Sequence, residues 1–252
     1  MPGCNSEERI PVSMFDSKKA VLFDLGGTLI EFEHKPWDKL ERDGIMRCRK
    51  FLVDLGFDLP GDEEFADSFG RFHFNIWKEI SEHNREISFD KRLSEFLGDY
   101  AIDLGEAIHK AVEVFYEVVT ENLTARDGAL DVLKAVRKRL FRIGLVSNSP
   151  FPAEWHRREM DRFGMLEYFD HTVFSSDFGT RKPDPSIFKE SLRNLGISAA
   201  ESVHIGDRPN EDVLGCIRTG ITSILVRRND RILPENIKPD YIVHNIQEVL
   251  AL

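Results

Sequence analysis

The chain has 252 residues, 41% hydrophobic and 31% charged, a composition typical of a soluble globular protein that buries a full core. Its 34 Lys and Arg against 44 Asp and Glu leave a net charge of −10, which argues against broad binding to nucleic acid or an anionic membrane. No long apolar run predicts a membrane-spanning helix. Residues 1–17 lack the apolar stretch of a secretory signal and are interpreted as a flexible tail.

The three cysteines, Cys4, Cys48 and Cys216, are far apart and show no CxxC spacing. This pattern excludes a disulfide framework and a zinc site built on cysteines, and it favours the reducing cytoplasm as the location of the protein.

The first predicted element is a strand over residues 20–24, within the stretch VLFDLGGTLI (21–30). The apolar run ends in a single carboxylate, Asp24, and two glycines and a threonine follow. A lone acid at the mouth of a buried strand is a candidate for chemistry rather than for packing.

Residues 31–122 have a different pattern, because apolar side chains recur there at helical spacing and we identify no strand between Glu31 and Asn122. The repeats are Ile45, Cys48, Leu52 and Leu55; Phe65, Phe69, Phe72, Ile76 and Ile80; and Leu104, Ile108, Val112, Phe115 and Val119. They predict a helical insert packed over the mouth of an α/β domain. We expect its aromatic residues to form its own core, with the alternative that two or three of them face a substrate: Trp37, Phe51, Phe65, Phe69, Phe72, Phe74, Trp77, Phe89 and Phe96.

From about residue 126 onward, apolar strands alternate with amphipathic helices that end on glycine. The predicted strands are 142–148, 171–177, 202–207 and 222–226, and the predicted helices are 152–164, 184–196 and 209–220. This alternation is typical of a parallel sheet covered by helices on both faces. We assign the strand at 20–24 to the same sheet.

Polar residues stand at or just beyond the carboxyl ends of four of these strands, the edge where parallel α/β sheets bind ligands. They are Asp24, Ser147, Asn148, Lys182, Asp207 and Asp212. Each alone has a simple structural explanation, such as a turn cap or a solvated loop charge. Together, along one edge, they predict a functional site.

Three converging carboxylates, Asp24, Asp207 and Asp212, would repel one another unless cations compensate them. Mg²⁺ suits such a site because it takes one or two carboxylates, a backbone carbonyl and waters, and leaves room for a phosphate oxygen. Lys182 would supply further positive charge. Asp24 is then a candidate nucleophile that attacks phosphorus to form an aspartyl phosphate.

The two glycines acquire a purpose in such a site. Gly26 and Gly27 have no Cβ, so the backbone can approach a phosphate closely and direct its N–H groups toward it.

Four motifs in this order resemble those of the haloacid dehalogenase-like (HAD) hydrolase superfamily: FDLGGTL (23–29), VSNS (146–149), TRKPDP (180–185) and IGDRPNED (205–212). The resemblance extends from residue 19 to the C-terminus. It implies an α/β fold with a Rossmann-like parallel-sheet core, residues 18–30 and 123–252. The all-helical insert, residues 31–122, is similar to the mobile cap of the superfamily's small-metabolite phosphatases.

The resemblance also implies a role for each motif residue. Asp24 would be the nucleophile and a Mg²⁺ ligand, the Gly26 carbonyl and Asp207 further ligands, and Asp212 an acid that supports the metal-bound waters. Ser147 would hydrogen-bond the phosphoryl group, with Asn148 beside it and Gly27 in the backbone cradle. Lys182 would steady both nucleophile and phosphate.

Gly26 departs from the family pattern. Typical family phosphatases have a second Asp there, which protonates the leaving alcohol and later activates water. General acid–base help contributes about 10²–10⁴ in rate, so its loss slows such an enzyme without abolishing it. Three compensations are open: a substrate with a good leaving group, a flap residue such as Glu31, Glu33 or His34, or loss of turnover.

We therefore predict a Mg²⁺-dependent phosphatase of a small phosphorylated metabolite, a monomer or homodimer with no nucleic-acid or membrane partner. One alternative is a non-catalytic member that binds a phosphorylated ligand or a partner. The other is a metal-free 2-haloacid dehalogenase. Two features oppose it: such enzymes usually have an aromatic residue at the position of Gly26, and Asp207 and Asp212 would burden a metal-free site.

Overall fold

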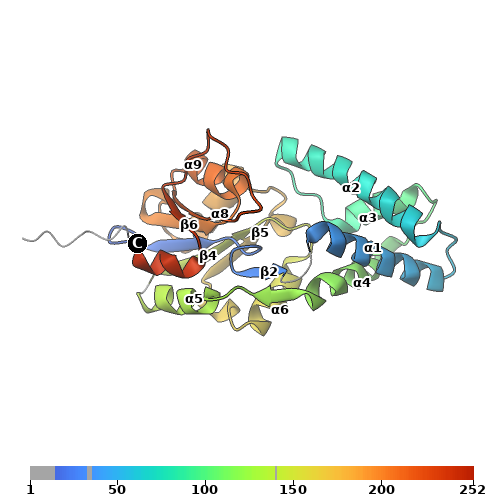
Figure 1. Ribbon diagram of the computed structural model, residues 1–252, viewed down its shortest axis with the longest axis horizontal. Helices are drawn as coiled ribbons and strands as arrows, with labels where there is room; N and C mark the ends of the chain where they lie inside the picture. Colours follow the sequence, from blue (N-terminus) through green and yellow to red (C-terminus); the bar gives the residue numbers. More distant parts are fainter. Residues whose placement is uncertain (1–14, 33–35, 140) are drawn as a thin grey trace, which may run out of the picture.

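The computed structural model describes residues 15–32, 36–139 and 141–252. They form a parallel β-sheet core with a lobe of helices at one end (Figure 1). Of the predicted N-terminal tail, residues 1–17, only the last three lie within the described residues.

Six strands form one sheet in the order β5–β4–β1–β6–β7–β8, and every neighbouring pair is parallel. Their bounds are β1 (Ala20–Phe23), β4 (Arg142–Ser147), β5 (His171–Phe174), β6 (Ser202–Gly206), β7 (Thr222–Val226) and β8 (Tyr241–Val243). The predicted α/β fold with a Rossmann-like sheet is confirmed. β1 lies inside the sheet. After β1 the chain adds β4 and β5 on one side of it, and then β6, β7 and β8 on the other side.

Helices cover both faces of this sheet. Those of the core are α5 (Ala129–Lys138), α6 (Ala153–Arg162), α7 (Ser175–Phe178), α8 (Pro185–Leu195) and α9 (Leu214–Thr219), with 3₁₀ turns at Leu166–Tyr168, Ala199–Glu201 and Ile246–Ala251 and a π-helical turn at Pro209–Val213. The side chains of alternate residues of β1 point to opposite faces of the sheet. Val21 and Phe23 belong to one apolar cluster, and Ala20 and Leu22 belong to another with Phe188 of α8.

One predicted strand is too long. The strand expected over 171–177 ends at Phe174, because Ser175–Phe178 close into the single helical turn α7. That turn ends on Gly179 with a φ of 82°, the left-handed conformation that glycine adopts without strain.

Four helices make up the lobe: α1 (Trp37–Asp54), α2 (Asp62–His83), α3 (Phe89–Gly98) and α4 (Ile108–Glu121), with a 3₁₀ turn at Gly105–Ala107. Its centre is aromatic, as expected, with Phe65, Phe69, Phe89 and Phe96 fully buried. Phe69 and Phe96 meet edge to face with 5.1 Å between ring centroids. No helix among the described residues has the length and apolar character needed to cross a bilayer.

The expectation of no strand between Glu31 and Asn122 is wrong at the base of the lobe. There β2 (Ile30–Phe32) pairs antiparallel with β3 (Leu123–Ala125). Strands of three residues are too short to show alternation in a sequence. This ribbon carries the chain into and out of the helices. β2 spans the boundary predicted at 30/31 and β3 begins at the one predicted at 122/123, and the division into domains remains a prediction.

A buried ion pair ties the lobe to the core. The Arg92 guanidinium on α3 donates to Glu86 at 2.7 Å, and the side chains are only 3% and 1% exposed. Ser175 at the start of α7 donates to the other oxygen of Glu86, also at 2.7 Å. Arg92 further lies 2.8 Å from Nε2 of His73 on α2. One network therefore links three segments of the lobe to the sheet edge.

A second polar cluster lies where α4 meets α6. The Tyr116 hydroxyl donates to Glu159 at 2.7 Å, and His156 lies 3.1 Å from the other Glu159 oxygen. Ser149, just beyond β4, lies 2.6 Å from Nε2 of His156. All four side chains are buried, and their mutual hydrogen bonds offset the cost of burying them.

We predict that Arg92→Met lowers the free energy of unfolding by about 3–5 kcal/mol, because it removes the hydrogen-bonded counter-ion of buried Glu86 and leaves only Arg181 at 3.9 Å. The matched control is Arg47→Met, which removes an exposed pair with Glu121 and should cost about 1 kcal/mol or less. Urea denaturation of both variants checks this. Equal losses in the two variants would contradict a special role for the buried pair.

Candidate active site

The register of the sheet brings the predicted residues to one edge. Phe23 of β1 lies opposite Leu145 of β4 and Ile205 of β6, so the three strands end side by side. The Asp24 backbone N–H continues the ladder by donating to the Ile205 carbonyl at 2.9 Å. Side chains that follow these strands therefore emerge close together.

Lys182 is the centre of this edge. Its Nζ donates to Oδ1 of Asp24 at 2.6 Å and to Oδ1 of Asp212 at 2.7 Å, and its side chain has no exposed area. The Thr28 hydroxyl donates to the other oxygen of Asp24 at 3.0 Å. Three predicted residues from distant parts of the chain thus meet through one ammonium group.

The two carboxylates that share Lys182 differ electrostatically. Burial raises the pKa of Asp24, and Lys182 only partly opposes this. Burial also acts on Asp212, but Lys182 and His204 outweigh it and hold the pKa of Asp212 well below its ordinary value. Asp212 accepts additional bonds from His204 Nε2 and the Arg208 backbone N–H, each at 2.9 Å.

Lys182 itself stays charged. Burial alone would lower its pKa, but Asp212 and Asp24 more than compensate and place the pKa of Lys182 above its ordinary value. The ammonium group therefore remains a fixed positive charge beside Asp24.

Asp24, Asp207 and Asp212 form what we call the acidic group, and Asp207 is the member that lacks hydrogen-bond partners. It is 1% exposed, and neither carboxylate oxygen accepts a hydrogen bond from the residues that the structure describes. The guanidinium of Arg231 lies 2.7 Å from Oδ2 as an ion-pair partner. One oxygen each from Asp24, Asp207 and Asp212 lie within 4.8 Å of one another. A buried carboxylate with unused oxygens in such a group fits a hard divalent cation.

The glycines after Asp24 differ in what they allow. Gly27 has a φ of 85°, and a Cβ there would lie 2.3 Å from the Asp207 carboxylate, so only glycine fits. Its N–H donates to the Ile30 carbonyl at 2.6 Å within the turn, so it is not directed at a phosphate as expected. Around Gly26, no atom lies within 4 Å of a Cβ position.

Ser147 and Asn148 follow β4. Ser147 is buried and lines the cavity above Asp24. The Asn148 side chain donates to the Lys182 carbonyl at 3.0 Å and to Glu211 at 2.9 Å, and it accepts from the Lys182 N–H at 2.8 Å. Asn148 therefore holds the loop that carries Lys182, a contact the sequence does not indicate.

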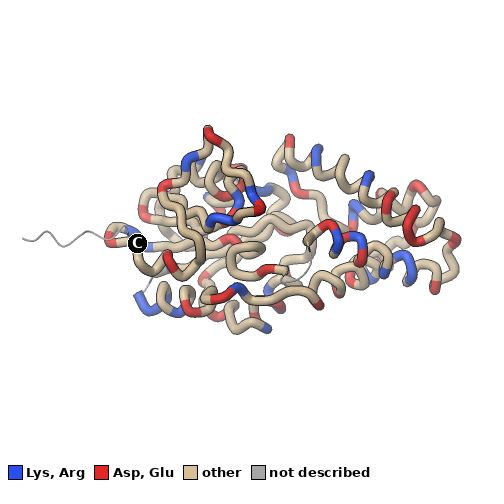
Figure 2. Tube along the Cα trace, viewed as in Figure 1, with Lys and Arg blue, Asp and Glu red and all other residues tan. Residues whose placement is uncertain are grey.

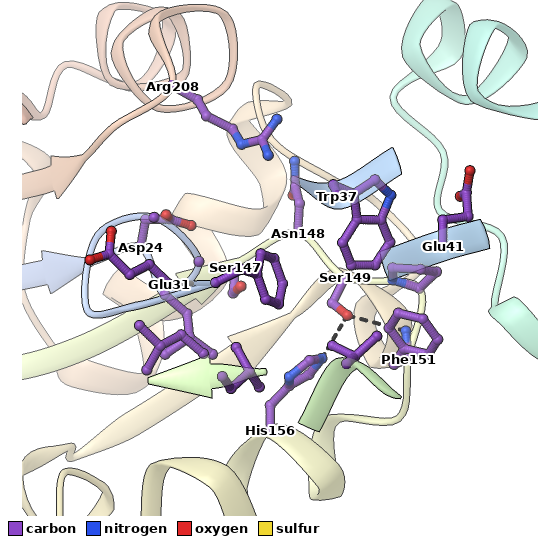
Figure 3. A pocket seen from close by; sticks show the side chains of 18 of the residues that line it. Asp24, Glu31, Trp37, Glu41, Ser147, Asn148, Ser149, Phe151, His156 and Arg208 are labelled. Atoms are coloured by element: carbon purple, nitrogen blue, oxygen red, sulfur yellow. Dashed lines mark hydrogen bonds between the residues drawn. The ribbon is translucent and has the colours of Figure 1, made fainter. Parts of the chain in front are cut away.

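A cavity of about 890 Å³ opens over these residues between the core and the helical lobe. Figure 3 shows Asp24 and Glu31 at one side of it, Glu41 and Phe151 at the other, and Ser147 and Trp37 between them. Its lining includes Trp37, Phe74 and Trp77, three of the aromatic residues listed for the insert. The expectation that all nine aromatic residues form the core of the insert is wrong for these three, which are 38%, 66% and 50% exposed, and the alternative that two or three of them face a substrate remains a prediction.

Basic side chains surround the acidic end of the cavity. They are Arg181, Arg208, Arg228 and Arg231. Elsewhere Lys and Arg are interspersed with Asp and Glu along the chain (Figure 2). The arginines give the cavity local positive charge within a chain of net charge −10.

Sequence reasoning missed several contacts of the site. Thr28 lies within the quoted first motif, and its spacing of four residues from Asp24 was an available signal. His204 is a packed side chain, as its place inside a strand suggests, but it packs on Asp212. Arg231, in the loop after β7, had no signal at all. Glu33 and His34 lie outside the described residues.

The chain belongs to the haloacid dehalogenase-like hydrolase family, whose model matches residues 18–220. This confirms the family resemblance. The chain is also similar to a glyceraldehyde 3-phosphate phosphatase of Methanopyrus kandleri, with 27% identity over 216 residues that cover 83% of this chain and 84% of that protein.

Solved structures share the fold. A HAD phosphatase from Thermococcus onnurineus aligns with a TM-score of 0.66 at 23% identity, covering 92% of this chain and 96% of that one. A 2-haloacid dehalogenase from Pseudomonas syringae pv. Tomato DC3000 aligns with a TM-score of 0.65 at 25% identity, covering 93% of this chain and 98% of that one. Because both chemistries use this fold, the choice between them depends on the site.

We predict that Asp207→Asn weakens Mg²⁺ binding by at least about 100-fold, beyond the effect typical of residues that only orient ligands. Isothermal titration calorimetry measures it. Burial, together with the charge of Asp24, raises the pKa of Asp207 to about 7, so protons compete with the cation and wild-type affinity should fall from about pH 8 to about pH 6. The control is Asp230→Asn, an exposed carboxylate of the same cavity; equal losses in both variants would remove Asp207 from the metal site.

Proposed function

We propose that this protein is a Mg²⁺-dependent phosphatase that hydrolyses a small phosphorylated metabolite through an aspartyl phosphate on Asp24. The observation that carries the proposal is the convergence of Asp24, Lys182, Asp207 and Asp212 at one sheet edge beneath a cavity. The similarity to named phosphatases supports the same class of reaction.

The residues present fit Mg²⁺. Asp24, Asp207 and the backbone carbonyl of Gly26 would hold the ion. Asp212 would act through bound water, because its oxygens already accept three hydrogen bonds from the protein, whereas those of Asp24 accept two. When bound, the ion would neutralise charge on the phosphoryl oxygens.

The chain's own groups account for the transfer step. Asp24 presents a carboxylate whose Oδ1 is fixed by Lys182 and whose Oδ2 is fixed by Thr28, so the nucleophile is oriented before substrate arrives. The positive charge of Lys182 reduces the electrostatic repulsion between the carboxylate and the phosphoryl group as they approach each other. Ser147, at the cavity wall, would donate a hydrogen bond to a phosphoryl oxygen. Asn148 keeps Lys182 in place.

No side chain replaces the missing acid in the described site. Glu31 lines the cavity, but its carboxylate is engaged by Arg228 at 3.3 Å and Arg126 at 3.6 Å. Both ion pairs involve the same carboxylate oxygen, so Glu31 is held at the cavity wall by two arginines. We therefore propose that the first step runs without general acid help.

The acidic group argues against a metal-free dehalogenase. Asp207 would be a buried carboxylate with no hydrogen bond and only arginine partners, an arrangement that costs free energy without serving the reaction. A phospho-ligand-binding protein without turnover is favoured by one observation, the absent side chain at Gly26. The next experiment separates it from the enzyme.

We expect the purified protein to release phosphate from 4-nitrophenyl phosphate with Mg²⁺ and to lose this activity in EDTA. Asp24→Asn should reduce the rate to background, because an amide is no nucleophile toward phosphorus. Asp67→Asn, an exposed carboxylate of α2, should retain full activity. Activity that survives in Asp24→Asn refutes the nucleophile. Binding of Mg²⁺ and beryllofluoride with no turnover would instead establish the non-catalytic alternative.

Gly26→Asp should raise kcat/KM for glyceraldehyde 3-phosphate, whose leaving group is aliphatic, by at least about tenfold toward the about 10²–10⁴ of a general acid. The position has room, since no atom lies within 4 Å of a Cβ there. Gly27→Asp is the control, and it should abolish activity because its Cβ would meet the Asp207 carboxylate. Steady-state kinetics of both variants decide the matter. An unchanged rate in Gly26→Asp would show that proton donation does not limit the reaction.

A further inference from the structure

The part of the cavity away from the acidic group is unusually aromatic. Trp37, Phe74 and Trp77 line it while remaining 38%, 66% and 50% exposed. On α2, Gly70, His73, Phe74 and Trp77 line it at helical spacing, so one face of that helix is turned to the cavity. Exposed aromatic side chains that gather at a cavity, rather than singly on a surface, indicate recognition of an apolar, flat group.

Trp37 connects this aromatic part to the reacting end. Its ring lies 5.6 Å from that of Phe32 on β2 and 6.5 Å from that of Phe151 beyond β4. Figure 3 shows Trp37 in the cavity, between Asn148 and Glu41 in this view. A substrate held at Asp24 therefore extends toward an aromatic wall.

Gly26 limits the leaving group independently. Among the residues that the structure describes, position 26 offers no acid and Glu31 is engaged by arginines, which favours a departing oxygen that leaves as an anion. A phenolic oxygen tolerates this far better than an aliphatic one, because the pKa of a phenol is about 10 and that of an aliphatic hydroxyl is close to water's, about 15.7.

We propose that the substrate is a small phosphate ester of an aromatic hydroxyl, with its phosphate at Asp24 and its ring against Trp37 and the α2 face formed by Phe74 and Trp77. This inference rests on the proposed phosphatase function. Two unrelated features, an aromatic wall and a missing proton donor, select the same chemical class.

The reaction balances without any further reagent. An Asp24 oxygen forms a bond to phosphorus as the bond from phosphorus to the phenolic oxygen breaks, and the phenolate leaves with that electron pair and takes a proton from water. Water then attacks the aspartyl phosphate and loses a proton to solvent, which gives inorganic phosphate and the free carboxylate. The sum is aryl phosphate plus water to phenol plus phosphate.

The test compares three esters under Mg²⁺ with the wild-type protein. Phenyl phosphate and benzyl phosphate share a ring but differ in the acidity of the leaving oxygen. Benzyl phosphate and glyceraldehyde 3-phosphate share an aliphatic leaving oxygen but differ in the ring. We expect kcat/KM to fall at least about 100-fold from phenyl to benzyl, since the benzyl alkoxide goes unprotonated. We expect a further fall from benzyl phosphate to glyceraldehyde 3-phosphate. The value of kcat/KM is the right measure, because it is insensitive to hydrolysis of the aspartyl phosphate.

Variants separate the ring contacts from the chemistry. Trp37→Ala and Trp77→Ala should each lower kcat/KM for both ring-bearing esters by roughly 2- to 12-fold, the factor typical of one aromatic contact. They should leave glyceraldehyde 3-phosphate unchanged. Ile217→Ala, on an exposed residue of α9 away from the cavity, should change none of the three.

The outcomes distinguish this inference from the function on which it rests. Similar rates for all three esters, or equal losses on all three in the Trp variants, overturn the inference and leave the phosphatase intact. If no ester is hydrolysed, the phosphatase proposal fails. In that case calorimetry with phenylphosphonate and methylphosphonate tests the ring site alone: a preference for the phenyl compound that Trp77→Ala removes supports it, and equal affinity overturns it.

Discussion

The buried contact of Lys182 with Asp24 and Asp212 is the interaction on which the site depends. Three carboxylates within 4.8 Å would otherwise have to protonate to be buried together. The Lys182 ammonium group lies 2.6 Å from Asp24 Oδ1 and 2.7 Å from Asp212 Oδ1. It keeps Asp212 ionised and places a fixed positive charge beside Asp24. Asp207 stays outside this arrangement: neither of its oxygens accepts a hydrogen bond from the described residues, and its nearest partner is Arg231 at 2.7 Å. The site therefore contains an internal counter-charge for Asp24 and Asp212, and a carboxylate, Asp207, that fits the cation we propose.

The sheet supplies the precision of this contact. Parallel pairing of β1 with β4 and β6 fixes where Asp24, Ser147 and Asp207 leave their strands. The loop that carries Lys182 has only a single antiparallel bridge, between Thr180 and Arg85, and Asn148 holds it further through three hydrogen bonds to Lys182 and Glu211. Residues at strand ends are placed by the backbone, and residues in loops are placed by side chains.

That distinction explains what the sequence could predict. The strand-end acids and Lys182 were predictable because motif order and strand order determine them. Arg231 reaches Asp207 from an irregular loop, and the β2–β3 ribbon is three residues long on each side, so neither leaves a pattern in the sequence. The aromatic residues fall between these cases. Phe65, Phe69 and Phe72 follow the apolar repeat of α2, whereas Phe74 and Trp77 lie off it, so the repeat held a signal that the expectation of one aromatic core did not use.

The two adjacent glycines show how a residue can be required for different reasons. At position 27, positive φ and the Asp207 carboxylate exclude every side chain, so glycine there is a matter of space. At position 26 the space is open, so the fold does not require glycine there, and glycine provides no proton donor. In the proposed mechanism, a site without this donor acts fastest on a substrate whose leaving oxygen needs no proton. The choice of substrate then depends on the leaving group, and we propose that the rings of the helical lobe contribute to that choice.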